Sequence, residues 1–145
     1  MKPVNTWIVL ADATTFRLAA NQGPGKGVYG LPDPGLVAPP VTALSDEPGM
    51  TNAPAGPNRG GISHPDLKGQ AQAGFADVIV RFLDAARRKK RFQRFILIAP
   101  PAMLGVLRQQ LTPQLQDVLH ADIARDLTHV PLDDLPGHLA DVLAV

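Results

Sequence analysis

Short runs of consecutive apolar residues alternate with amphipathic segments along this chain. Residues 7–11 form one such run, which is typical of a central strand buried on both faces. After a plausible turn at residues 12–13, residues 15–20 carry apolar side chains at every second position. We therefore predict that residues 15–20 form a hairpin partner to the first strand.

The clearest pattern is an apolar stripe that begins at Phe75, recurs at i+3, i+4, i+7 and i+8, and ends at Ala86. This spacing predicts an amphipathic helix with one buried face. On the outer face, two aspartates each precede an arginine by four residues, a spacing worth about 0.2–0.5 kcal/mol per pair. These pairs are Asp77 with Arg81 and Asp84 with Arg88. The helix is predicted to end in the basic residues 87–91, whose positive charges interact favourably with the negative end of its dipole.

The second half of the chain continues this alternation. Residues 95–99 are a second apolar strand, followed at once by a helix that starts at residues 100–101, which predicts parallel pairing of the two apolar strands through a right-handed crossover. We predict a short helical turn from Pro113, an edge strand over residues 119–124 and a final helix over residues 132–143. The fold class is thus α/β, a single domain with a mixed β-sheet of about five strands flanked by helices.

Residues 21–70 are dense in glycine and proline, and residues 41–44 are a weak strand candidate among them. Such a stretch buries too little surface to offset its ordering entropy, and loops longer than about 12–15 residues are usually functional or disordered. We predict a flexible Pro/Gly-rich loop at about residues 45–68 within one domain spanning residues 1–145.

Composition removes several classes of protein. The chain has 145 residues and a net charge of +1. It has no cysteine, and this excludes disulfides, thiol catalysis and cysteine-ligated metals. The first apolar stretch is too short for a signal-peptide core or a membrane span, so we expect a cytoplasmic protein. Composition leaves the oligomeric state open.

Positive charge is concentrated near the end of the predicted long helix. Between Arg81 and Arg94 there are seven basic residues and one acidic residue. Charge at this density binds phosphates in a salt-dependent manner, although a solvated helix end explains the same residues. The candidate nucleic-acid-binding residues are Lys68, Arg81, Arg87, Arg88, Lys89, Lys90 and Arg91.

Cofactor sites have little support. No glycine-rich phosphate-binding pattern follows either apolar strand, so we expect no bound cofactor. A ligand in an open α/β sheet would lie beyond the carboxyl ends of its strands, where Thr14, Thr15 and Arg17 are candidates, although a hairpin turn explains them equally. Ser45 and Ser63 are the only serines, and neither lies in a nucleophile-elbow pattern.

Two groups of metal-ligating residue types occur late in the chain. They are His120, Asp122 and Asp126, and His129 with Asp133, Asp134 and His138. The solvent face of an edge strand and the first turn of a helix explain both groups, so we predict no metal site. In the first half, Asp12 is the only carboxylate that adjoins a core strand, which disfavours a two-metal centre.

Several of these segments share a further pattern: residues 7–12 with the Thr-Phe-Arg hairpin, the helix over residues 75–83, and residues 91–101. Leu-Gly-Val-Leu-Arg at residues 104–108 and Ala-Arg-Asp-Leu-Thr-His at residues 124–129 continue it. Together they resemble the bacterial host-attachment protein family over nearly the whole chain. The Ala-Pro-Pro block followed by Leu-Gly-x-Leu-Arg is the most specific part. The resemblance implies a role in attachment to host cells and brings no biochemical activity with it.

That family is in turn similar to the middle domain of archaeal and eukaryotic class I peptide chain release factors. This mixed-sheet α/β domain places a Gly-Gly-Gln loop in the ribosomal peptidyl transferase centre, immediately before a long helix. Here Lys68-Gly69-Gln70 holds that position, and the resemblance assigns catalysis to Gly69 and Gln70. Lys68 replaces the first glycine, so part of the close backbone approach is lost. We therefore favour binding to the ribosome or tRNA over peptidyl-tRNA hydrolysis.

Two functional hypotheses follow. The leading one is a release-factor-like accessory factor that associates with the ribosome or RNA through the basic helix end. The alternative is a non-catalytic protein-interaction module involved in attachment to host cells, whose loop at residues 45–68 orders on a protein partner. The sequence leaves open whether any reaction is catalysed.

Overall fold

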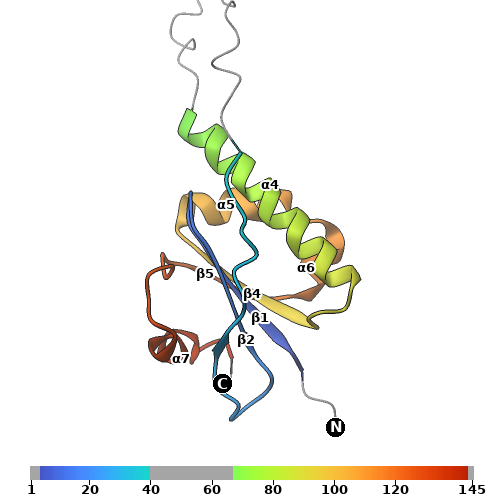
Figure 1. Cartoon of the computed structure of the whole chain (residues 1–145), viewed down its shortest axis with the longest axis vertical. Coiled ribbons are helices and arrows are strands. Elements are labelled where there is room, and N and C mark those ends of the chain that lie inside the picture. Colours follow the sequence, from blue (N-terminus) through green and yellow to red (C-terminus); the bar gives the residue numbers. More distant parts are fainter. Residues whose placement is uncertain (1–3, 40–66, 144–145) are drawn as a thin grey trace, which may run out of the picture.

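A computed structural model describes residues 4–39 and 67–143 of the chain. Its strands form one mixed sheet in the order β3-β2-β1-β4-β5 (Figure 1). The strands are β1 (Thr6–Ala11), β2 (Phe16–Asn21), β3 (Tyr29–Gly30), β4 (Arg94–Ala99) and β5 (Leu119–Ala124). The helices are α4 (Leu67–Arg88), α5 (Pro101–Gln110), α6 (Pro113–Val118), the 3₁₀ helix η1 (Leu132–Asp134) and α7 (Leu135–Leu139). The single α/β domain with a five-stranded mixed sheet is as the sequence predicts.

The central strand β1 pairs with its two neighbours in opposite senses. It is antiparallel to β2, as predicted for a hairpin, and parallel to β4, with Val9 opposite both Leu18 and Leu97. Strand β5 is parallel to β4 and forms the other edge of the sheet. The carboxyl ends of β1, β4 and β5 therefore lie together, and we call this side the carboxyl end of the sheet.

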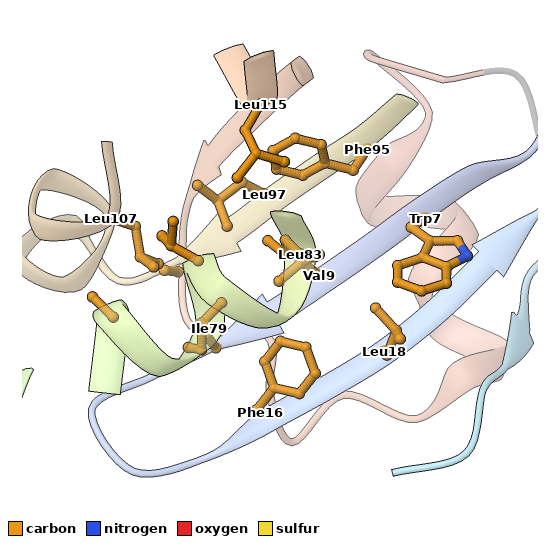
Figure 2. Close-up of a cluster of buried hydrophobic side chains, with 14 of the residues drawn as sticks. Trp7, Val9, Phe16, Leu18, Ile79, Leu83, Phe95, Leu97, Leu107 and Leu115 are labelled. Atoms are coloured by element: carbon orange, nitrogen blue, oxygen red, sulfur yellow. The ribbon is translucent and has the colours of Figure 1, made fainter. Parts of the chain in front are cut away.

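Side chains of β1 alternate between two apolar clusters, which explains its unbroken hydrophobic run. Trp7, Val9 and Ala11 pack in the cluster under α4, α5 and α6, part of which Figure 2 shows. Ile8 and Leu10 face the opposite cluster. That second cluster also contains Ala19, Ile96, Ile98, Leu127, Leu135, Leu139 and Leu143. Both faces of the sheet are thus covered within the described part of the chain.

Helix α4 buries the predicted stripe, including Phe75, Ile79 and Leu83. It ends in a Schellman motif, in which the Arg91 amide donates to the Ala86 carbonyl and the Lys90 amide to that of Arg87. Lys90 occupies the left-handed position at φ 59°, where glycine is usual.

Three segments differ from the prediction. The helix expected over residues 132–143 is divided into η1 and α7 and ends at Leu139. Pro136 has no amide to donate to the Leu132 carbonyl, which breaks α-helical bonding at the junction, and Gly137 is a poor helix former. Strand β3 was not predicted, since two residues carry no periodic pattern. Helix α4 begins at Leu67, so Lys68 belongs to its first turn.

The strand candidate at residues 41–44 and most of the loop at 45–68 lie outside the described residues. Among the helices that are described, none has the length and apolar character needed to cross a membrane.

Candidate functional site

Asp12 directly follows β1 at the carboxyl end of the sheet and closes the hairpin to β2. Its Oδ1 accepts hydrogen bonds from the Thr14 and Thr15 amides at 2.9 and 2.6 Å. The Asp12 amide donates to the Thr15 carbonyl at 2.9 Å. These bonds engage Oδ1, while Oδ2 lies 3.2 Å from Thr128 Oγ1. Thr14 and Thr15 therefore serve the hairpin turn, the structural alternative that the sequence left open.

The loop at residues 125–130 follows β5 and approaches the same turn. Arg17, on β2, holds this loop by donating from Nη1 to backbone carbonyls. The acceptors are Thr128 at 2.8 Å, Val130 at 2.7 Å and, more weakly, Leu127 at 3.4 Å. One guanidinium nitrogen thus connects the hairpin to a loop more than a hundred residues away in sequence.

The hydrogen bonds at the hairpin turn and those from Arg17 to the 125–130 loop bring three side chains together: Asp12, Asp126 and His129. One ligand-type atom from each, a carboxylate oxygen or an imidazole nitrogen, lies within 4.8 Å of the other two. Thr128 is buried and links the carboxylates, since its Oγ1 lies 2.6 Å from Asp126 Oδ1 and 3.2 Å from Asp12 Oδ2. A hydroxyl carries one proton, so it serves only one of these oxygens at a time.

Asp12 keeps its negative charge because the folded chain donates hydrogen bonds to its carboxylate. Burial acts to raise the pKa of Asp12, but hydrogen bonds from the Thr14 and Thr15 amides and the Thr128 hydroxyl outweigh it, and this pKa lies below its ordinary value. Within residues 4–39 and 67–143, neither Asp12 nor Asp126 forms an ion pair. Asp77, Asp84 and Asp122, in contrast, each pair with arginine. Two adjacent carboxylates therefore lack a cationic partner in the described part of the chain.

Comparison with protein families gives a match that spans most of the chain. The model of a family described as "Protein required for attachment to host cells" matches residues 7–139. The chain belongs to this host-attachment family. No curated protein matches it.

In this chain, the residues assigned by the release-factor resemblance lie apart from most of the basic ones. Lys68, Gly69 and Gln70 lie in the first turn of α4, and Lys68 and Gln70 are exposed. From Gln70 to Arg88 the helix rises by about 27 Å at 1.5 Å per residue. One small ligand therefore cannot contact Gln70 and the residues at 87–91 together.

The basic residues differ in how much of their charge is available. The two predicted ion pairs are present, Arg81 with Asp77 at 3.0 Å and Arg88 with Asp84 at 2.8 Å. Two further basic residues also have partners. Arg87 pairs with Asp84 as well, and the Arg91 guanidinium lies 5.2 Å from the Trp7 ring centroid. Lys89 and Lys90 are exposed and form no ion pair with a described residue.

The two metal groupings weighed from the sequence do not form. His120 contacts the Val142 carbonyl and Arg94, while Asp122 is paired with Arg108 at 2.7 Å. Asp126 and His129 join Asp12 instead, a combination that sequence reasoning missed. The available signal was that Asp12 and Ala-Arg-Asp-Leu-Thr-His each follow a strand directly. Strands that run parallel end on the same side of a sheet.

Arg17 also lines a pocket of about 200 Å³. It is lined by Phe16, Arg17, Leu18, Gly30, Leu31, Asp33 and Leu132. Arg17 therefore borders the pocket and also supports the loop that carries Asp126 and His129. We call Asp12, Asp126, Thr128 and His129 the carboxyl-end site.

Proposed function

We propose that the chain acts as a non-catalytic protein-interaction module in attachment to host cells, and that its partner docks at the carboxyl-end site. The family match over residues 7–139 supports the first part of this proposal. The second part rests on the convergence of Asp12, Asp126 and His129. This role needs a presented surface and no chemical step.

Rigidity of the site favours binding. Arg17 holds the 125–130 loop by its backbone, and Thr128 ties Asp126 to the same loop through its amide and hydroxyl. A loop already fixed in one conformation loses little entropy when a partner docks. Asp126 and His129 themselves are exposed, so a partner can reach them without displacing the core.

The test is attachment of the cell that carries this gene. Deleting the gene is expected to reduce attachment to host cells, and the wild-type gene should restore it. The double variant Asp126→Asn with His129→Ala should restore attachment poorly. A matched variant, Asp133→Asn with His138→Ala, changes the same residue types at two exposed positions of the C-terminal segment and should restore it fully.

Each arm of this assay addresses a different part of the proposal. Normal attachment by the deletion strain would remove the attachment role. Full restoration by the Asp126→Asn, His129→Ala variant would leave that role intact and exclude the carboxyl-end site as the docking surface.

A second candidate is the release-factor-like association with the ribosome or RNA. The observation in its favour is the exposed Lys89-Lys90 turn, whose charges pair with no described carboxylate. Because phosphate contacts release counterions, such binding weakens steeply with salt. Co-sedimentation with ribosomes should fall with added salt and fall further on Arg88→Ala with Lys89→Ala. Arg125→Ala with Lys26→Ala is the charge-matched control, and free sedimentation of the wild type at low salt would exclude this candidate.

Catalysis under the second candidate would depend on Gln70, assisted by Gly69. Gln70→Ala is then expected to lower peptidyl-tRNA hydrolysis while ribosome binding stays unchanged. Equal hydrolysis by the wild type and Gln70→Ala would exclude Gln70 as the catalytic residue.

A further inference from the structure

The carboxyl-end site combines ligand types that a transition metal prefers. Two carboxylates and one imidazole are borderline-hard ligands suited to Zn²⁺ and its neighbours, whereas Mg²⁺ and Ca²⁺ prefer oxygen alone. The three groups come from two segments that meet only in the folded chain, and His129 is what distinguishes the set from an ordinary acidic surface.

The geometry is close to what a metal requires. Ligands about 2.1 Å from a tetrahedral Zn²⁺ lie about 3.4 Å from each other. The ligand atoms here lie within 4.8 Å of one another, so they must approach by at most roughly 1.4 Å to bind such an ion. Asp126 and His129 are exposed and can close this difference by side-chain rotation, while Asp12 is held by the hairpin amides.

The surrounding residues leave the ligand atoms available. Asp12 uses Oδ1 for the turn amides, and its Oδ2 accepts from the Thr128 hydroxyl, whose proton it shares with Asp126. In the part of the chain that the structure describes, nothing hydrogen-bonds to the His129 imidazole. The guanidinium of Arg17 is directed at backbone carbonyls and pairs with neither carboxylate.

The carboxylates of Asp12 and Asp126 pair with no cation in the described part of the chain, which favours binding of a positive ion. Two neighbouring carboxylates repel each other when both are charged, and a bound cation replaces that repulsion with attraction. Thr128 and Arg17 would then hold the ligands in orientation without touching the metal, the arrangement usual around metal sites.

We propose that Asp12, Asp126 and His129 bind one divalent transition-metal ion, with Zn²⁺ as the probe. The site extends the proposed function by giving the docking surface a cation, yet it is tested on the isolated chain and does not depend on attachment. With three protein ligands, a tetrahedral ion keeps one position open to another ligand.

The experiment is calorimetric titration of the tag-free full chain with Zn²⁺, and with Mg²⁺ as a second arm. One Zn²⁺ per chain should bind, and Mg²⁺ should bind far more weakly. Asp126→Asn with His129→Ala replaces two of the three ligands and is expected to weaken Zn²⁺ binding by more than about 10-fold, since changing an outer-shell partner alone costs about 10–100-fold. Asp133→Asn with His138→Ala should bind as the wild type does.

Folding does not confound this comparison. Asn keeps the Oδ1 acceptor that Thr128 uses, and both substituted positions are exposed, so the unfolding temperature without metal should change little. No saturable Zn²⁺ binding by the wild type would overturn the proposal, as would equal affinity in the two double variants. Because neither result involves host cells, failure of the metal site is separable from failure of the attachment role.

Discussion

Replacing Arg17 with methionine tests the anchor on which the carboxyl-end site depends. Methionine retains the apolar part of the side chain but removes the donors to three carbonyls. Nη1 carries two protons, which serve Thr128 at 2.8 Å and Val130 at 2.7 Å, so the third contact at 3.4 Å adds little. Hydrogen bonds from a charged donor contribute about 1.5–3 kcal/mol each.

The expected loss is about 3 kcal/mol, the lower end of that sum, because Arg17 is only half-buried and water can reach part of the loop. For a domain of this size, such a loss lowers the unfolding temperature by about 6–12 °C. Thermal unfolding followed by circular dichroism measures it. Amide exchange in residues 125–130 should also accelerate, since the loop loses its main attachment to β2.

Arg88→Met is the matched control, because the Arg88 side chain is 72% exposed and pairs only at the helix surface. It should cost less than about 1 kcal/mol. Equal unfolding temperatures for Arg17→Met and Arg88→Met would show that Arg17 does not hold the loop, and the reasoning for a preorganised site would fail with it.

Three further outcomes are expected. Lys90→Gly should stabilise the chain by about 1 kcal/mol in chemical denaturation, because glycine adopts the left-handed Schellman position without strain; Lys89→Gly, at no such position, should not. Leu139→Ala should destabilise it by about 2–5 kcal/mol, since Leu139 is fully buried; a smaller loss would mean that α7 packs loosely. Asp12, whose pKa is lowered by folding, stabilises the folded chain above the unfolded pKa near 4 and loses that contribution as pH falls through the folded value. With a metal chelator present, the difference in unfolding free energy between the wild type and Asp12→Asn should therefore shrink below about pH 4. A difference that grows would contradict the hydrogen bonds described for Asp12.

The central strands and the long helix were predictable because local patterns encode them. An apolar run at residues 7–11 and the stripe from Phe75 to Ala86 reflect burial on two faces and on one face, and both clusters are present. The C-terminal helix was harder to predict. Leu135, Leu139 and Leu143 are buried at helical spacing, although the helix stops at Leu139. The spacing of buried residues alone does not reveal where helical hydrogen bonding stops.

The carboxyl-end site was not predictable in the same way. Asp12 and Thr128 are 116 positions apart, and their meeting depends on the direction of β5 and on the bonds from Arg17 to carbonyls. Backbone carbonyls carry no residue identity, so sequence gives no sign of such a contact. Grouping neighbours along the chain therefore placed Asp126 with His120 and Asp122, whereas Asp122 pairs with Arg108.

The claim that Asp12, Asp126 and His129 act as one site is tested most directly by crystals soaked in Zn²⁺ and measured at the zinc absorption edge. We expect one anomalous peak per chain, about 2.0–2.2 Å from an oxygen of each carboxylate and from a His129 ring nitrogen. A peak bound only at His120 or His138, or no peak at the carboxyl end of the sheet, would contradict it.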